Sequence, residues 1–245
     1  MMAEDFSGQT VIVTGAASGI GLSQAKLFLE NNATVVALDK NEIPLQNSNL
    51  YTLIGNVSDI PTFDKLRELI QKVSGKIDVV CNTAGVLDDY RNVIDTSVDQ
   101  WNDTIQTDLT SQFLMIKTVL PIMLEQKHGV FVNMASIAGL VAGGGGVAYT
   151  AAKHAVIGMT KQLDIDYAGQ GIRANCIAPG AIDTPMNAAD FAGDGKMAKW
   201  VADETPAKRW ATPDEVAELS LFLSSERSDY IHGSVVPIDG GWTAK

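Results

Sequence analysis

The chain has 245 residues, which suits one large α/β domain or two small ones, with an ordinary mixture of 46% hydrophobic and 19% charged residues. Its formal net charge of −11 argues against a nucleic-acid partner or an anionic membrane surface, because both attract clustered Lys and Arg. We find no secretion signal, no membrane-spanning stretch and no metal-ligand spacing of Cys and His, so we expect a cytoplasmic protein without a metal.

Short β-branched runs alternate with longer helical patterns along the whole chain. The runs are nearly all apolar, as parallel strands covered on both faces require. This alternation predicts one α/β domain, 1–245, with a doubly wound parallel sheet of about seven strands and helices on both faces. The expected strands are Thr10–Thr14, Thr34–Asp39, Tyr51–Gly55, Asp78–Asn82, Val130–Met134, Ala174–Ala178 and Val235–Ile238, and the expected helices are Ile20–Asn31, Thr62–Val73, Val98–Gln126, Tyr149–Ala168 and Pro213–Ser224.

Residues 183–208 form the least regular part of the sequence and are rich in Ala, Gly, Asp and Met. A compact domain rarely carries so long an irregular segment without a reason, and a lid over a site is a common one. We expect a substrate lid here, and a simple surface excursion is the alternative.

The first expected strand leads into TGAASGIG, from Thr14 to Gly21, and then directly into a helix. Gly15, Gly19 and Gly21 allow a tight turn that brings backbone N–H groups toward a pyrophosphate at the positive end of the helix. Ser18 can add a hydroxyl donor. Because the turn stands between a strand and an amphipathic helix, it predicts a dinucleotide site.

Asp39 ends the second expected strand, eighteen residues after Gly21. A carboxylate there can accept hydrogen bonds from both ribose hydroxyls of NAD, and it would repel the 2′-phosphate of NADP. Lys40 follows and could partly offset that repulsion. The pattern therefore favours NAD, with NADP as the alternative cofactor, and a loop-starting Asx residue is the other interpretation of Asp39.

Further motifs follow in order along the chain. They are NTAG at Asn82–Gly85, Ser136 within NMASIAG, YTAAK at Tyr149–Lys153, APGAIDTPM at Ala178–Met186 and the ending GSVVPIDGGW. Together with TGAASGIG they resemble the short-chain dehydrogenase/reductase family over essentially the whole chain. The resemblance implies a Rossmann-type fold and an oxidoreductase that moves a hydride between a nicotinamide and a carbonyl or secondary alcohol.

The residues of YTAAK suit this chemistry. Tyr149 and Lys153 stand four apart on one expected helix and therefore share a face. A free tyrosine, with a pKa of about 10, is a poor base at neutral pH, and a neighbouring ammonium favours the phenolate. Ser136 follows an expected strand, where ligands of open α/β sheets gather, and its hydroxyl can orient the substrate oxygen. We expect Tyr149 to be the general acid/base, and a surface packing contact is the alternative for the pair.

The resemblance also implies the remaining cofactor contacts. Ala17 and Ile20 belong to the glycine-rich turn. Asn56, which replaces the family's usual aspartate, and Val57 would meet the adenine. Lys153 would also hold the nicotinamide ribose. The adenosine side would pass Asn82, Ala84 and Gly85, while Pro179, Gly180 and Ile182 would pack on the nicotinamide and Thr184 would touch its carboxamide.

The sequence departs from the family at Asp108. In IQTDLTSQF this residue stands where the family usually has a catalytic asparagine, whose main-chain carbonyl in many members holds a water that leads from the lysine to solvent. A main-chain role would survive the change. The carboxylate could pair with Lys153, trap it, or add a charge to the relay. We expect Asp108 to be compatible with activity and to alter its pH profile.

The resemblance further implies a homotetramer built through the expected helices Val98–Gln126 and Tyr149–Ala168 and the last strand. The alternative is that the apolar faces of these helices are buried within the monomer.

The substrate is less determined. The loop AGLVAGGGGVA between Ser136 and Tyr149 is small and apolar, which leaves room for a substrate but offers few polar contacts. The leading interpretation is an NAD(H)-linked dehydrogenase or reductase of a small or medium alcohol or ketone, such as a diol, sugar, hydroxy acid or steroid-like ring.

Two alternatives stay open. The first is a 3-oxoacyl-(acyl-carrier-protein) reductase, which Asp39 and the acidic composition disfavour, although Lys127 and Arg173 could form a local basic patch. The second is a non-catalytic dinucleotide-binding redox sensor, in which Asp108 would mark lost catalysis.

Overall fold

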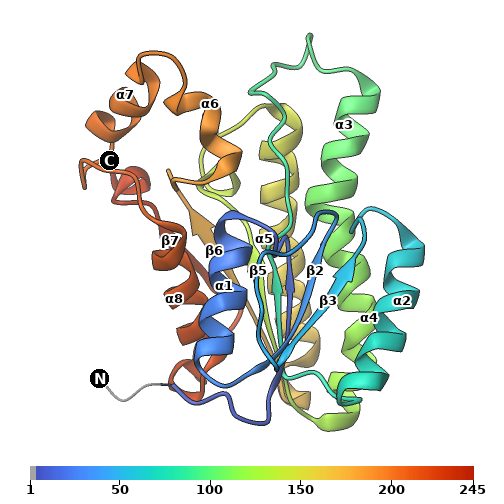
Figure 1. The fold of residues 1–245 in the computed structure, drawn as a ribbon. Coiled ribbons are helices and arrows are strands. Elements are labelled where there is room, and N and C mark those ends of the chain that lie inside the picture. The colour runs from blue at the N-terminus through green and yellow to red at the C-terminus, as the bar shows by residue number, and fades with distance from the viewer. Residues whose placement is uncertain (1–3) are drawn as a thin grey trace.

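Seven parallel strands form the centre of the protein, in the order β3-β2-β1-β4-β5-β6-β7 (Figure 1). The computed structural model describes residues 4–245. Strand order reverses between β1 and β4, and the crevice at the carboxyl ends of such strands is where open α/β sheets bind ligands. The predicted doubly wound sheet is confirmed. The strands are β1 (Thr10–Thr14), β2 (Thr34–Asp39), β3 (Leu50–Ile54), β4 (Val79–Asn82), β5 (Gly129–Met134), β6 (Ile172–Pro179) and β7 (Val235–Ile238).

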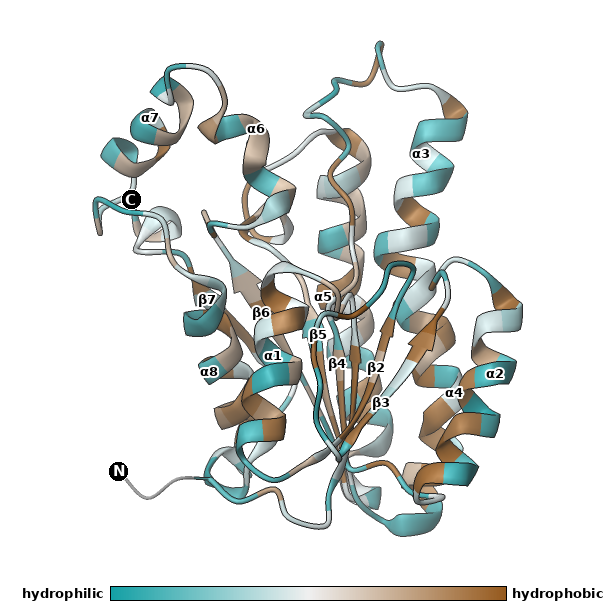
Figure 2. Ribbon diagram, in the orientation of Figure 1, coloured by the Kyte–Doolittle hydropathy of each residue, from teal (hydrophilic) through white to brown (hydrophobic). Residues whose placement is uncertain are grey.

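Helices cover both faces of the sheet, and the strands between them are largely apolar (Figures 1 and 2). Neighbouring residues of a strand point to opposite faces. Val11 of β1 belongs to the apolar cluster that contains Phe28 of α1, whereas Ile12 belongs to the cluster that contains Leu66 of α2 and Met115 of α4. The helices are α1 (Gly19–Glu30), α2 (Ile60–Val73), α3 (Val98–Ile105), α4 (Ser111–Gln126), α5 (Val147–Tyr167), α6 (Ala188–Phe191), α7 (Lys196–Glu204) and α8 (Pro213–Ser224).

The two edge strands differ from the other five. We predicted every strand to be covered on both faces, and β1, β2, β4, β5 and β6 are almost wholly buried. In contrast, β3 and β7 are partly exposed, because each has a neighbouring strand on one side only.

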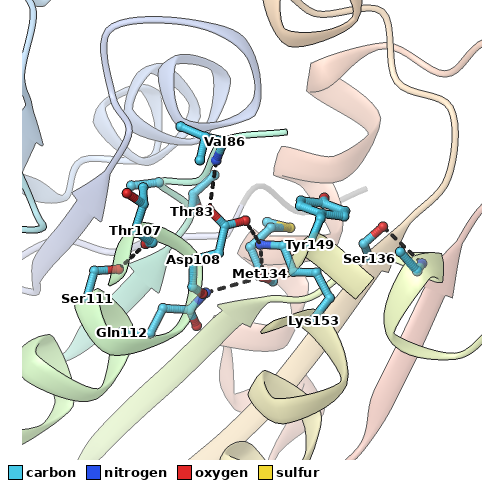
Figure 3. A network of polar contacts seen from close by, with 12 residues as sticks. Thr83, Val86, Thr107, Asp108, Ser111, Gln112, Met134, Ser136, Tyr149 and Lys153 are labelled. Carbon is cyan, nitrogen blue, oxygen red and sulfur yellow. Dashed lines mark hydrogen bonds and ion pairs between the residues drawn. The ribbon is translucent and has the colours of Figure 1, made fainter. Parts of the chain in front are cut away.

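A π-helical turn, Gln106–Thr110, interrupts the single helix that we predicted over Val98–Gln126. It separates α3 from α4, and Asp108 lies within it, fully buried. A π-turn adds a residue to the helical repeat and is often found at functional sites. Within this turn, the Asp108 side chain points toward Lys153 (Figure 3).

The segment 183–208, expected to be irregular, contains the helices α6 and α7. Both lie at the carboxyl edge of the sheet, beyond β6 and β7 (Figure 1). Within residues 4–245, none of the helices combines the length and the apolar character that crossing a membrane requires.

Candidate active site

The glycine-rich turn between β1 and α1 requires its glycines. Gly15 (φ +71°) and Gly19 (φ +52°) have left-handed backbone, which side chains other than glycine rarely adopt. A Cβ atom on Gly21 would collide with the carbonyl oxygen of Gly15. The turn therefore keeps a side-chain-free cradle at the N-terminus of α1, where backbone N–H groups attract anions. This cradle fits the pyrophosphate of a dinucleotide.

A cavity of about 270 Å³, called here the turn cavity, opens beside this cradle. Two of the predicted cofactor residues, Ala17 and Asn82, line neither this cavity nor the one around Tyr149. The Ala17 N–H donates to Asp39 Oδ2 (3.0 Å), and the Asn82 side-chain amide donates to Asn133 Oδ1 (2.8 Å) in the sheet interior. The predicted residues that line the cavity are Gly15, Ser18, Gly19, Ile20, Gly21, Asp39, Asn56, Val57, Ala84, Gly85 and Thr184.

The Asp39 carboxylate is held at the rim of the turn cavity by two backbone donors. Ala17 N–H binds Oδ2, and Asn41 N–H binds Oδ1 at 2.8 Å. Lys40 and Asn41 also line the cavity, although the sequence analysis singled out only Lys40 as a modifier of the charge. Each carboxylate oxygen keeps a free lone pair, so Asp39 can still accept hydrogen bonds from a ligand.

A second cavity of about 540 Å³, called here the tyrosine cavity, brings together Ser136, Tyr149 and Lys153. Pro179, Gly180, Ile182 and Thr184, which the sequence predicts beside the nicotinamide, line it as well. The two cavities adjoin, because both are lined by Ile20, Thr83, Gly85, Thr184 and Met186.

Lys153 lies at the centre of a buried polar network (Figure 3). Its ammonium is 5.2 Å from the centroid of the Tyr149 ring. It donates a hydrogen bond to the main-chain oxygen of Met134 (3.1 Å) and forms an ion pair with Asp108 Oδ2 (3.2 Å). The other oxygen of Asp108 accepts a hydrogen bond from the Val86 N–H (2.8 Å). The Lys153 charge and the Val86 N–H favour the ionised form of Asp108, whereas its burial favours the neutral form.

Burial dominates the pKa values of this network. It raises the pKa of Tyr149, although the Lys153 charge and a hydrogen bond with Ser136 favour the phenolate. The negative charge of Asp108 adds to the rise in the Tyr149 pKa. For Lys153, burial favours the neutral amine, but the charges of Asp108 and Tyr149 outweigh it, so the pKa of Lys153 is raised. Burial likewise raises the pKa of Asp108 against the opposing effect of Lys153.

The main-chain oxygen of Asp108 has a partner within the protein. Gln112 Nε2 donates to it at 3.2 Å and also to the main-chain oxygen of Met134 at 3.3 Å (Figure 3). Asp108 itself lines neither cavity and touches the site through Lys153.

Asp88, which the sequence analysis did not single out, ties the loop after β4 to the helix that carries Tyr149. Its Oδ1 accepts a hydrogen bond from Gly146 N–H (2.7 Å), and its Oδ2 accepts one from Tyr149 N–H (2.9 Å). The Arg91 carbonyl accepts a third from Val147 N–H (3.0 Å). The first N–H groups of a helix lack partners within it, so this carboxylate caps α5 and fixes the backbone of Tyr149.

The basic patch considered for Lys127 and Arg173 does not form beside the site. Arg173 is buried near the amino end of β6, opposite the carboxyl edge that carries the two cavities, and donates to the carbonyls of Leu223 (2.9 Å) and Ser225 (3.1 Å). Lys127 ends α4 at the same amino edge of the sheet, just before β5.

The chain matches the family model described as Enoyl-(Acyl carrier protein) reductase over residues 15–243. It is 37% identical over 241 residues to the dehydrogenase/reductase SDR family member 6 of Rattus norvegicus, with 96% of this chain and 98% of that protein covered. It is 35% identical to the 3-oxoacyl-(acyl-carrier-protein) reductase FabG of Thermotoga maritima, covering 96% and 97% of the two chains. A solved structure of 4-hydroxyisoleucine dehydrogenase with NADH superimposes with a TM-score of 0.90 at 31% identity, covering 97% of this chain and 100% of that one.

These matches extend over nearly the whole chain, and they agree with the sheet order and with the cavities at its carboxyl edge. The chain therefore belongs to the short-chain dehydrogenase/reductase family, and it is an oxidoreductase that uses a nicotinamide dinucleotide to interconvert alcohol and carbonyl groups of small molecules.

Proposed function

We propose that the protein is an NAD(H)-dependent oxidoreductase of secondary alcohols and ketones in which Tyr149 is the general acid/base. The observation that carries the proposal is that Ser136, Tyr149 and Lys153 line one cavity, and that this cavity adjoins the turn cavity beside the glycine cradle. This arrangement suits a substrate oxygen at Tyr149 and a dinucleotide that extends from there to the turn.

In alcohol oxidation, the Tyr149 phenolate removes the hydroxyl proton, and in ketone reduction the phenol returns it. The Ser136 hydroxyl orients the substrate oxygen and favours the phenolate by hydrogen bonding, an effect that lowers the Tyr149 pKa. Lys153 keeps a positive charge beside Tyr149 and can hold the nicotinamide ribose. The nicotinamide supplies the hydride acceptor or donor when it is bound.

The remaining residues would contact different parts of the dinucleotide. The cradle of Gly15, Gly19 and Gly21, together with Ser18, would bind the pyrophosphate, and Asp39 the adenosine ribose. The wider contacts carried over from the family are proposed for Asn56 and Val57 at the adenine, Ala84 and Gly85 beside the adenosine, and Pro179, Gly180, Ile182 and Thr184 at the nicotinamide. Ala17 supports this set by holding Asp39, and Asn82 supports it by joining β4 to β5.

NAD is the proposed cofactor because a carboxylate stands at the ribose position. Asp39 keeps free acceptor capacity for two ribose hydroxyls, and its charge repels a 2′-phosphate. Lys40 lines the same cavity and weakens this repulsion. The solved 4-hydroxyisoleucine dehydrogenase, which superimposes well on this chain, holds NADH.

A 3-oxoacyl-(acyl-carrier-protein) reductase is the second candidate, favoured by the 35% identity to the enzyme of that name from Thermotoga maritima. An acyl carrier is acidic and needs cations near the cavity mouth. Arg173 is buried at the opposite edge of the sheet, and the net charge is −11, which argues against such a partner.

We also propose that residues 183–208 act as a lid and that the protein forms a homotetramer. The lid is supported by Met186, Asp190 and Trp200, which lie in this segment and line the tyrosine cavity. The assembly is supported by exposed apolar side chains on the outer helices, Phe113 on α4 and Ile165 on α5. The cytoplasmic location stays a prediction from the sequence.

The test is a panel of secondary alcohols, ketones and 3-oxoacyl thioesters assayed with NADH and NAD⁺. Reduction with deuterium-labelled NADH is expected to leave one deuterium on the carbinol carbon of the product. Preference for the carrier thioester would establish the second candidate instead. Tight NADH binding with no turnover of any member would contradict the enzymatic proposal and support the redox-sensor interpretation.

A further inference from the structure

The far end of the tyrosine cavity is built from large aromatic and methionine side chains. This end, as named here, consists of side chains from the loop after β4, from residues 183–210 and from the C-terminal segment, and one of them, Met186, also lines the turn cavity. The whole cavity, at about 540 Å³, is within the range of about 300–1,000 Å³ that is usual for small-molecule sites. The side chains at this end are Tyr90, Met186, Met197, Trp200, Trp210 and Trp242.

These walls are held in place by the protein itself. Trp210 Nε1 donates to the Ala198 carbonyl (2.9 Å), and its ring centroid is 4.8 Å from that of Phe191, so α6 and α7 are both attached to it. Tyr90 has left-handed backbone (φ 55°), a conformation that lasts only where neighbouring contacts enforce it. Tyr90 and Trp200 are each 54% exposed, so both offer apolar surface for a ligand to cover.

Lys153 and Asp190 are the charged residues that line the tyrosine cavity. Lys153 is already engaged by Asp108 and by the Met134 carbonyl. A carboxylate or phosphate on the substrate would therefore meet no unpaired cation in the lining, and it would face the negative charge of Asp190.

Cations near the rim have acidic partners of their own. The Lys245 ammonium lies over the Trp242 ring (4.3 Å to the centroid) and is 3.5 Å from Glu204 Oε2. Arg91 Nη2 is 3.5 Å from Asp89 Oδ2. An anionic substrate would have to compete with these ion pairs.

Asp190 is the charged acceptor at this end. Throughout the described chain, no group forms a hydrogen bond or ion pair with its carboxylate. It stands close to Tyr90, since burial and then the Asp190 charge raise the pKa of the Tyr90 phenol. A hydroxyl or amine at the far end of a ligand can donate a hydrogen bond to Asp190, whereas a sugar would leave most of its hydroxyls against apolar walls.

Within the function proposed above, on which this inference rests, we infer that the substrate is an uncharged secondary alcohol on a hydrocarbon ring system, or the matching ketone. Asp190 is the specificity-determining residue that rejects anionic substrates. In the oxidation, the ring carbinol carbon loses two electrons and one hydrogen as hydride to NAD⁺, giving a ketone and NADH, and the hydroxyl proton leaves through Tyr149 to solvent.

The test compares substrates that differ in one feature at a time. The panel is 2-decalol, a hydroxydecalin carboxylate, 2-butanol, 3-hydroxybutyrate and glucose, with kcat/KM measured in the presence of NAD⁺. We expect 2-decalol to exceed the hydroxydecalin carboxylate at least 100-fold and 2-butanol at least 10-fold. A wild-type preference for the carboxylate, for 3-hydroxybutyrate or for glucose overturns the inference and leaves the proposed function standing.

Substitutions assign the discrimination to residues. Asp190→Lys is expected to raise kcat/KM for the hydroxydecalin carboxylate at least 10-fold without changing NADH affinity, and Asp190→Asn to have an intermediate effect. Asp194→Lys makes the same change of charge in the exposed loop between α6 and α7, and it is expected to leave the ratio of kcat/KM for 2-decalol to that for the hydroxydecalin carboxylate unchanged. Trp200→Ala should raise KM for 2-decalol about 10-fold and spare 2-butanol.

An unchanged ratio in Asp190→Lys, or an equal gain in Asp194→Lys, overturns the role of Asp190. Failure of the wild type to turn over any member, with NADH still bound, overturns the proposed function and this inference with it.

Discussion

Replacement of Asp108 by Asn tests the most unusual feature of the site. Asp108→Asn keeps the size and polarity of the side chain, and it removes one negative charge beside Lys153. The amide oxygen can still accept a hydrogen bond from the ammonium or from the Val86 N–H. The buried ammonium then acts on Tyr149 without a neutralising carboxylate, so the Tyr149 phenolate becomes easier to form.

The distances between the groups set the magnitude of the effect of the Asp108 charge on Tyr149. Asp108 Oδ2 is 3.2 Å from the Lys153 ammonium, which is 5.2 Å from the Tyr149 ring centroid. The carboxylate is therefore within about 8 Å of the ring, where a unit charge at an effective dielectric constant of about 20 contributes roughly 2 kcal/mol. Since one pH unit corresponds to about 1.4 kcal/mol, we expect the pH profile to move by about 1 to 1.5 units.

The assay is kcat/KM for alcohol oxidation between pH 5.5 and 10. Oxidation needs the phenolate, so its rate rises with pH through the Tyr149 titration. The wild-type carboxylate raises the pKa of Tyr149, and its removal is expected to move this rise to lower pH. Asp103→Asn, which removes the same charge from the exposed face of α3, is expected to leave the profile unchanged.

An unchanged profile in Asp108→Asn would mean that the carboxylate charge is not felt at Tyr149. A rise that moves to higher pH would mean that Asp108 acts mainly by keeping Lys153 protonated. Either result would contradict a direct effect of the Asp108 charge on the Tyr149 pKa.

Three further changes test the cofactor site and the helix that carries the tyrosine. Asp39→Asn keeps an acceptor for the Ala17 N–H and for a ribose hydroxyl but removes the charge, so the ratio of kcat/KM with NADH to kcat/KM with NADPH should fall at least 10-fold. Lys40→Gln should raise the same ratio. A ratio that changes in neither variant would contradict the cofactor proposal. Gly21→Ala should lower the free energy of unfolding in urea by about 1–3 kcal/mol and weaken NADH binding, because the new Cβ collides with backbone atoms. The control is Gly158→Ala on the exposed face of a helix, where nothing obstructs a Cβ, and it should raise the free energy of unfolding by about 1 kcal/mol. Asp88→Asn should lower kcat about 10-fold with little change in NADH affinity, because the amide cannot accept from both Gly146 and Tyr149; kcat equal to wild type would reject the positioning role.

The parts of the fold and site that follow local rules could be predicted from the sequence. Buried parallel strands are continuous apolar runs in the sequence, so their positions along the chain could be predicted. The glycine cradle could be predicted because its left-handed backbone conformations and the close backbone approach at Gly21 both require glycine. Tyr149 and Lys153 were placed together because side chains four apart share a helical face.

The parts of the fold and site that depend on a single extra residue or on segments distant in sequence could not be predicted. The π-turn at Gln106–Thr110 leaves no trace in an apolar pattern that continues on both sides of it. Asp88 is one of two adjacent aspartates in a loop, and its partners at Gly146 and Tyr149 are about sixty residues away in sequence. The aromatic end of the tyrosine cavity arises only when Tyr90 and Trp242, from opposite halves of the chain, are brought together.

Replacement of Tyr149 by Phe removes the hydroxyl that is proposed to transfer the proton. The measurement is the single-turnover rate of the variant with saturating NADH and the best ketone of the panel, beside Tyr230→Phe, which changes a fully exposed tyrosine. We predict that Tyr149→Phe binds NADH with wild-type affinity and loses at least 100-fold in rate, within the range of general acid catalysis of about 10²–10⁴, while Tyr230→Phe is unaffected. A Tyr149→Phe rate within a few-fold of wild type would contradict the claim.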